Sequence, residues 1–117
     1  MSKELDIAVA RALGFRVVKD AANVRGCQIG TAGKNGFDLP YYTDDARQTR
    51  LILKEIERRI LIDVYVTALL IIVLPESERW DITSEPGGYV DRQMIFTLLC
   101  ATPEQHCRAF IAVCGQL

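Results

Sequence analysis

The most continuous apolar run in the chain covers residues 60–74 and is closed by Pro75. It contains one acid, Asp63, and one threonine, Thr67, while many of its other side chains are β-branched. β-Branched residues lose rotamer freedom in a helix and pack well on a pleated surface. A continuous apolar run between a charge and a proline is typical of a strand buried on both faces. We therefore predict that residues 60–74 form the central strand of a sheet with helices on each side.

A helix is the alternative for this run. If the preceding helix continued through residue 74, it would be about thirty residues long with no polar face in its second half, so it would have to be buried on all sides. As a helix the run is also shorter than the roughly 20 residues that a bilayer core requires. The strand is the simpler interpretation, and no membrane association is expected.

Helical spacing of apolar residues predicts a first helix between Ser2, a suitable N-cap, and Gly14, which suits the position just after a helix end. A short strand is predicted at 15–19. A second helix is predicted to begin at Thr43 as its N-cap, with two aspartates in the first turn. Its buried stripe is expected at Ala46, Thr49, Leu53, Ile56 and Ile60.

The last helix has the most specific start signal in the chain. Thr102 is a suitable N-cap, Pro103 suits the first helical position, and Gln105 completes a capping box. The helix is expected to end at Gly115. Its predicted buried face consists of Cys107, Phe110, Ile111 and Cys114.

Three segments are less regular. Residues 20–40 hold four glycines and predict a long irregular loop, which in a compact domain is often functional or mobile. Residues 75–90 turn at 86–88 and predict a hairpin or an insertion. Residues 91–100 fit either a strand or a short helix capped by Asp91, and we favour the helix.

These elements predict an α+β fold in a single domain over 1–117. The expected architecture is a three-layer α/β/α sandwich, a small mixed or antiparallel sheet with helices on both faces. Lysine and arginine number 14 against 15 acids, so there is no basic surplus for binding a nucleic-acid backbone. The N-terminal segment lacks the features of a signal peptide. The four cysteines are therefore expected to be reduced thiols in a cytoplasm.

The cysteines and the single histidine give no strong site. Cys107 and Cys114 lie two helical turns apart, about 10 Å along the axis, which is too far for two ligands of one zinc ion. His106 and Cys107 are neighbours in the sequence and point about 100° apart on a helix, so the histidine cannot activate the thiol. We expect His106 on a solvated face, and we predict no metal, no cofactor and no catalytic residue.

The glycine-rich loop is the best candidate for ligand binding. Backbone amides between glycines, together with a lysine and an arginine, could hold a phosphate. The loop lacks the spacing of a Walker motif, and a plain surface loop is the alternative. The candidate ligand-binding residues are Arg25, Gly30, Gly33, Lys34 and Asn35. Outside the loop, Asp63 needs a partner if it is buried, or else it marks the solvent edge of the predicted strand.

Two motifs resemble those of the phage ABA sandwich domain family. The first is PYYTD at 40–44, where the family typically has a serine at the position of Tyr42. The second is ATPEQ at 101–105, followed by CRAF at 107–110. The helix that leads into Gly14 and Phe15 is similar as well. The resemblance implies an α/β/α sandwich encoded by a phage or prophage, and it implies no particular activity.

We therefore expect a phage accessory protein in the host cytoplasm that acts by binding, without turnover. The target would be a host protein or a small signalling nucleotide, in a counter-defence role. The alternatives are an enzyme that acts on a phosphate-containing substrate and a structural protein of the virion. A homo-oligomer, most simply a twofold dimer, is expected to cover the apolar surface that the predicted strand leaves open.

Overall fold

The computed structural model describes residues 3–19, 25–31, 34–74 and 92–115. The predicted α+β class, with helices packed against a small antiparallel sheet, is confirmed. In chain order the described elements are α1 (Lys3–Ala12), β1 (Arg16–Lys19), β2 (Cys27–Thr31), β3 (Lys34–Asp38), α2 (Ala46–Arg58), α3 (Ile62–Val73), α5 (Arg92–Leu99) and α6 (Pro103–Cys114).

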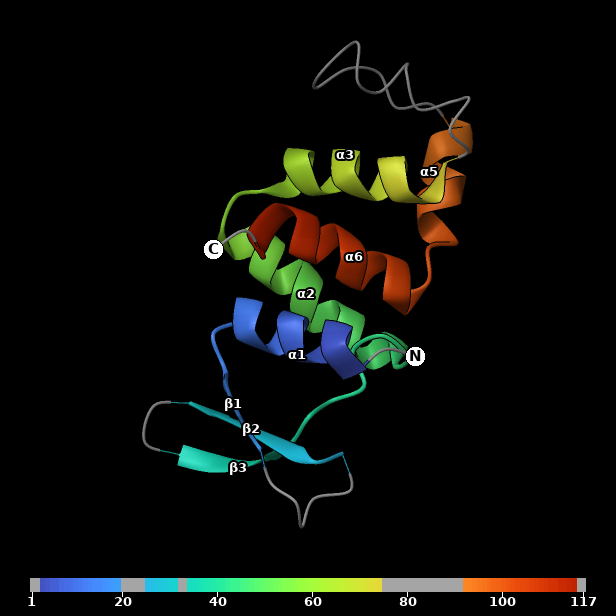
Figure 1. The fold of residues 1–117 in the computed structure, drawn as a ribbon. Helices are drawn as coiled ribbons and strands as arrows, with labels where there is room; N and C mark the ends of the chain where they lie inside the picture. Colours follow the sequence, from blue (N-terminus) through green and yellow to red (C-terminus); the bar gives the residue numbers. More distant parts are fainter. Residues whose placement is uncertain (1–2, 20–24, 32–33, 75–91, 116–117) are drawn as a thin grey trace.

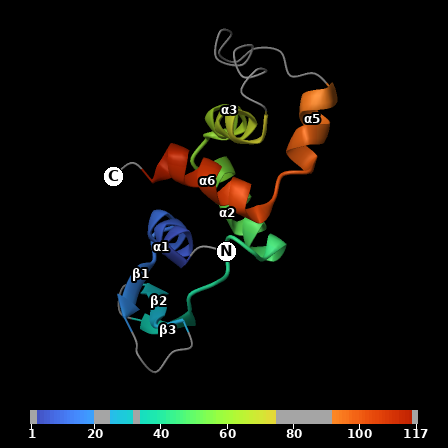
Figure 2. The same cartoon turned by 45° about the vertical axis from the view of Figure 1, so that its right-hand side comes forward.

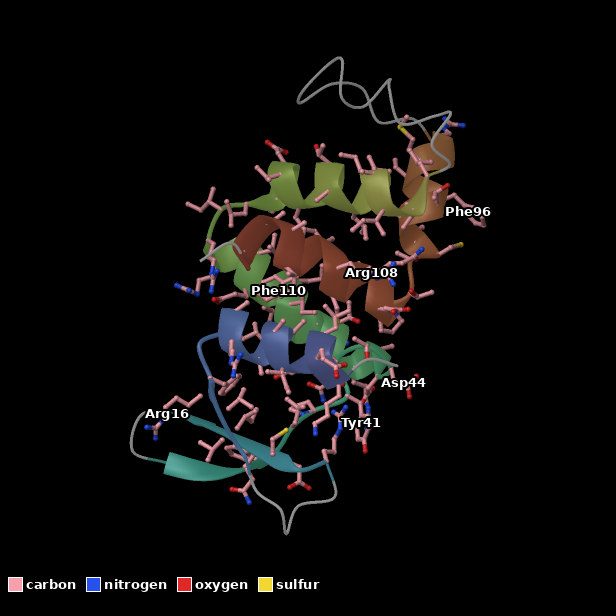
Figure 3. All side chains as sticks on the ribbon, viewed as in Figure 1. Arg16, Tyr41, Asp44, Phe96, Arg108 and Phe110 are labelled. Carbon is pink, nitrogen blue, oxygen red and sulfur yellow. The ribbon has the colours of Figure 1, made fainter. Side chains whose placement is uncertain are left out.

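Helix α6 lies at the centre of the helical part and packs on α1, α2 and α3 (Figures 1 and 2). The sheet lies beyond α1, and α3 lies at the opposite end of the molecule, with α5 beside it. Phe110 is fully buried where α6 faces α1 (Figure 3). Val9 of α1, Ile52 of α2 and Cys107 of α6 are also fully buried, so the main core is formed between helices.

The sheet has the order β1-β2-β3 and is antiparallel throughout. The predicted strand at 15–19 is confirmed as β1. The prediction of an irregular loop over 20–40 is wrong for its described part, because β2 and β3 pair with Ile29 opposite Phe37. Cys27 and Ile29 alternate with the less buried Gln28, as in a half-buried strand. The glycines in this segment obscure that short alternation in the sequence.

The predicted central strand at 60–74 is also wrong, since α3 occupies Ile62–Val73. Packing outweighs the β-propensity of its residues, because α3 buries Tyr65, Leu69 and Leu70 and packs on α6 and α5. A turn separates α3 from α2, so the two do not form one long helix. Among the described helices none is long and apolar enough to cross a membrane.

The predicted start of α6 is confirmed: Thr102 Oγ1 accepts from the Gln105 amide at 3.2 Å, and Gln105 Oε1 accepts from the Thr102 amide at 2.9 Å. The predicted start of α2 is wrong. Its N-cap is Asp45, whose Oδ1 accepts from the Arg47 amide at 2.9 Å. The helical interpretation of residues 91–100 is confirmed by α5, whereas its predicted cap and the hairpin at 75–90 lie outside the described residues.

Thr43 lies in the turn before α2, and its backbone is held there by a fully buried carboxylate. Asp6 of α1 accepts a hydrogen bond from the Thr43 amide at 2.8 Å and forms an ion pair with Arg25 at 2.6 Å. Arg25 also donates to the carbonyl oxygens of Leu39 and Pro40, at 3.0 and 2.9 Å. A buried charge is tolerated only when it is paired and hydrogen-bonded. These contacts fix α1, the start of β2 and the segment between β3 and α2 relative to one another.

The turn between α2 and α3 places a β-branched residue in the left-handed region. Ile60 has φ 58°, and its side chain is 88% exposed. The Leu61 amide donates to the Ile56 carbonyl at 3.0 Å, and the Ile60 amide donates to the Glu57 carbonyl at 3.1 Å. This is the pattern of a Schellman motif, in which glycine is the preferred residue at the position of Ile60.

We predict that Ile60→Gly increases the free energy of unfolding by roughly 0.5–1 kcal/mol, because glycine removes the left-handed strain and little buried surface is lost. Urea denaturation of the variant and the parent measures the change. Gly14→Ala is the matched control: Gly14 has φ +99° with open space around it, so the added methyl group should destabilise through the backbone alone. An unchanged or lower stability of Ile60→Gly would contradict the prediction.

Candidate functional site

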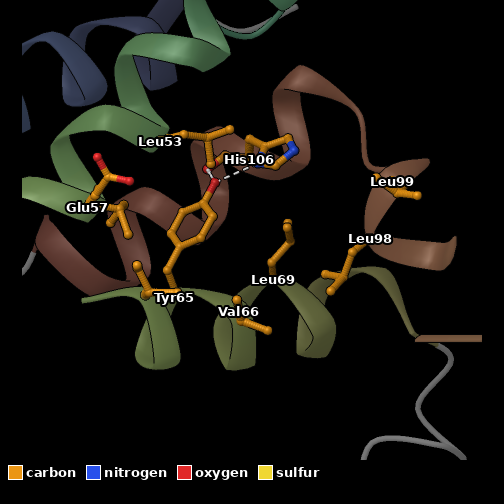
Figure 4. Close-up of a pocket in the computed structure, with 10 residues that line it drawn as sticks. Leu53, Glu57, Tyr65, Val66, Leu69, Leu98, Leu99 and His106 are labelled. Atoms are coloured by element: carbon orange, nitrogen blue, oxygen red, sulfur yellow. Dashed lines mark hydrogen bonds between the residues drawn. The ribbon is translucent and has the colours of Figure 1, made fainter. Parts of the chain in front are cut away.

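An apolar pocket of about 300 Å³ lies between α2 and α3 (Figure 4). Four helices line it. Its lining residues are Leu53, Ile56 and Glu57 of α2, Ile62, Tyr65, Val66 and Leu69 of α3, Leu98 and Leu99 of α5, and His106 of α6. We call this pocket and its rims the α2–α3 groove.

The groove exists because α2 and α3 both pack mainly on α6 and contact each other little. Helix α6 contributes to the floor through His106, and the last turn of α5 closes one side (Figure 4). Three apolar rim residues remain in contact with solvent: Leu53 is 43% exposed, Ile62 is 53% exposed and Leu99 is 78% exposed. Adjacent exposed apolar side chains around a concave surface are typical of an interaction site.

The groove's inner wall holds a polar pair. Tyr65 Oη lies 2.6 Å from His106 Nδ1 and donates to the His106 carbonyl oxygen at 3.3 Å (Figure 4). The two rings are stacked, with centroids 6.0 Å apart and planes 15° from parallel. The prediction that His106 lies on a solvated face is therefore wrong. Its half-buried ring anchors the first turns of α6 to α3.

Burial decides the charge state of the groups around this pair. It lowers the pKa of His106 and raises the pKa of Tyr65, so both side chains are neutral near pH 7. Burial also raises the pKa of the neighbouring Cys107 thiol to about 12, which keeps that sulfur protonated and unreactive. The pair therefore provides a neutral hydrogen-bonded surface within an apolar groove, which suits binding.

The structure brings together three of the five residues predicted to bind a ligand. Gly30 is in β2 and pairs with Asn35 of β3, and Lys34 begins β3. Gly33 lies outside the described residues. Arg25 precedes β2 at its other end, where its guanidinium is bonded to Asp6 and lies 3.9 Å from the centre of the Tyr41 ring. Ligand binding at this hairpin stays a prediction.

The cysteines and Asp63, which were also considered as site residues, are distributed over the fold. Cys100 is exposed, and the other three cysteines are buried. In the part of the chain that the structure describes, no three His, Cys, Asp or Glu side chains are placed to hold a metal ion. Asp63 is exposed in the first turn of α3, where the helix dipole favours an acid.

The sequence interpretation missed the groove because it assigned 60–74 to a strand. Had that run been treated as helical, Tyr65 and Leu69 would fall on one face. A buried tyrosine hydroxyl usually finds a hydrogen-bond partner, and His106 is the only histidine in the chain. A predicted contact between Tyr65 and His106 was therefore the feature of the sequence that could have indicated the groove.

No protein-family model, curated protein or solved structure matches this chain. What the groove can do is therefore inferred from its geometry.

We predict that acid destabilises the protein through His106. The folded-state pKa lies below the ordinary value of 6.5, so the unfolded chain takes up a proton first. Stability should fall as the pH drops through 6.5 and should level off below the folded-state pKa. Urea midpoints at several pH values between about 7.5 and 5.5 test this.

His106→Asn is the matched variant, because an amide can replace the Nδ1 contact without titrating in this range. Its midpoint should change less with pH than that of the parent. The carboxylates with lowered pKa values, such as Glu55 at about 2, lose their contribution only below about pH 4.5 and do not interfere. Equal pH dependence in parent and variant would contradict the prediction.

Proposed function

We propose that this protein acts by binding a partner protein, without turnover, and that the α2–α3 groove holds the partner. The observation that carries the proposal is the combination of an apolar pocket with exposed apolar rims. Leu53, Ile62 and Leu99 each leave about half or more of their surface in water, although the pocket beside them is already formed. Covering pocket and rims together would bury a continuous apolar surface.

The rims favour a protein partner over a small molecule. Small-molecule pockets enclose most of the ligand surface, and a volume of about 300 Å³ is at the small end of their range. A small ligand of that volume would leave much of the exposed surface of Leu99 and Ile62 in water. A partner segment that places one or two side chains in the pocket would also cover these rims, as in complexes where a helix lies in a groove.

The biological setting of the proposal comes from the motifs that resemble the phage ABA sandwich family. We propose a phage or prophage accessory protein that acts in the host cytoplasm on a host protein, in a counter-defence role. A twofold homodimer is a separate part of the proposal. The dimer was predicted from a strand at residues 60–74, and those residues form α3 instead. The exposed apolar side chain that supports a dimer is now Phe96, which is 62% exposed and points outward from α5 (Figure 3).

We predict that Leu53→Glu weakens the binding of an uncharged apolar probe, such as Nile red, whereas Leu51→Glu does not. Both leucines are on α2 and are similarly exposed, at 43% and 46%, but only Leu53 lines the groove. A charge in the groove should weaken apolar binding by tenfold or more, since placing it there costs at least about 1.4 kcal/mol. Probe fluorescence measures the affinity.

Circular dichroism and urea midpoints establish that both variants remain folded. If the two substitutions weaken probe binding equally, or if neither does, the groove is not the apolar binding surface and the proposal fails. Loss of probe binding in Leu53→Glu alone supports it.

A further inference from the structure

The face of α2 that borders the groove is basic over part of its length. Arg50, Leu53, Lys54 and Glu57 have the spacing i, i+3, i+4 and i+7, which places them on one helix face. Arg50 and Lys54 are both exposed. They therefore flank Leu53, a rim residue of the groove, with two cationic side chains.

These two cations differ from four arginines of α2, the turn after it and α6, which form ion pairs. Arg47 pairs with Asp45, Arg58 and Arg59 both pair with Glu55, and Arg108 pairs with Glu104. Within the described residues Arg50 and Lys54 form no ion pair with an acid. In the described part of the chain, two positive charges beside an apolar groove thus have no acidic partner, and this determines which partner charge would be attracted.

The shape of the groove determines the kind of segment. Its α3 wall runs from Ile62 to Leu69, and seven residues of helix span about 10.5 Å. A partner helix with apolar anchors at i, i+3 or i+4, and i+7 has the same length of contact. An extended segment is less suitable, because the walls of the groove are helices and offer no free strand edge for its backbone.

We propose that the partner segment is an amphipathic helix whose apolar stripe is bordered by acidic side chains. The inference rests on the proposed function of the groove and adds the chemistry of its partner. The apolar stripe packs between Leu53, Ile62 and Leu99, while two acids about one helical turn apart meet Arg50 and Lys54. The complex is held by apolar burial, and the charges select the partner.

Glu57 gives the complex a direction. It lies on the same face of α2 as Arg50 and Lys54 but nearer to the C-terminal end of the helix. A partner acid placed over Glu57 would be repelled. The acidic end of the partner helix therefore lies over the first half of α2, and its neutral or basic end lies near Glu57 and Ile62.

Two synthetic peptides test the inference. Each has about 20 residues, long enough to form a helix, with leucines at i, i+3 or i+4, and i+7. One carries glutamates beside the leucines, and the other carries lysines at the same positions. Fluorescence anisotropy at low salt should show that the parent protein prefers the glutamate peptide by about fivefold to tenfold, as two exposed ion pairs allow. Added salt should reduce the preference.

A charge swap identifies the residues that cause the preference. The double variant Arg50→Glu, Lys54→Glu should prefer the lysine peptide. The control is Arg11→Glu, Arg16→Glu, which changes the net charge equally with two exposed arginines outside the groove. Arg16 lies on the sheet, at the opposite end of the molecule from α3 (Figure 3). This control should retain the preference for the glutamate peptide.

Each other outcome overturns the inference in a recognisable way. If both peptides bind equally, or the swap leaves the preference unchanged, the partner is not selected by acidic charge. The proposed function of the groove is tested separately by Leu53→Glu. If neither peptide binds while the apolar probe does, the partner is not a helix. If light scattering shows a dimer that Leu53→Glu dissociates, a second copy of the chain occupies the groove.

Discussion

A helix with very few polar residues has to bury most of its surface, and α3 imposes this constraint on the molecule. Its inner face is covered by α6, and one end is covered by α5. Helix α2 contacts it little, so the space between α2 and α3 remains open. The groove is one part of the α3 surface that the described residues leave uncovered, and Val64, outside the groove, is also 54% exposed. The proposed function follows from this incomplete burial, since a partner in the groove would cover apolar surface on both α2 and α3.

The rest of the fold keeps this uncovered surface in a fixed shape. The Tyr65–His106 contact holds α3 on α6, and burial keeps both groups neutral. At the other end of the helical part, the Asp6–Arg25 ion pair ties α1 to the sheet and to the segment before α2. With α2 and α3 both seated on α6, the groove is largely preformed. A preformed surface loses less conformational entropy on binding than one that must first become ordered.

The sequence predicted those elements whose signals are local. The α6 capping box involves residues three positions apart, and the strand β1 begins a few residues after the end of α1. The strand prediction for residues 60–74 was wrong because a mostly apolar segment has no polar face. Without one, its hydrophobic periodicity does not distinguish a buried strand from a buried helix. Thr43 and Asp45 are both suitable caps by residue type, and the contact that holds Thr43 in the turn before α2 is made by Asp6, 37 residues away in the chain.

The site could be predicted still less, because its contacts are distant in sequence. Tyr65 and His106 are 41 residues apart, and the groove collects side chains from four helices. The glycine-rich segment was predicted to be a ligand-binding loop because of its composition, but most of its described residues pair in the hairpin of β2 and β3. Arg25, predicted to bind a ligand, is mostly buried against Asp6. The residues near Arg25 in the sequence do not indicate that Asp6 is its partner.

The groove is tested most directly by a methyl NMR titration of the folded protein with an uncharged apolar probe such as Nile red. The methyl signals of the groove residues should shift together and saturate together, namely those of Leu53, Ile62, Val66 and Leu99. The methyl signals of Val18 and Leu51, which are exposed outside the groove, should stay in place. Shifts that spread equally over both groups, or that spare the groove residues, would contradict the claim that the α2–α3 groove is the binding surface.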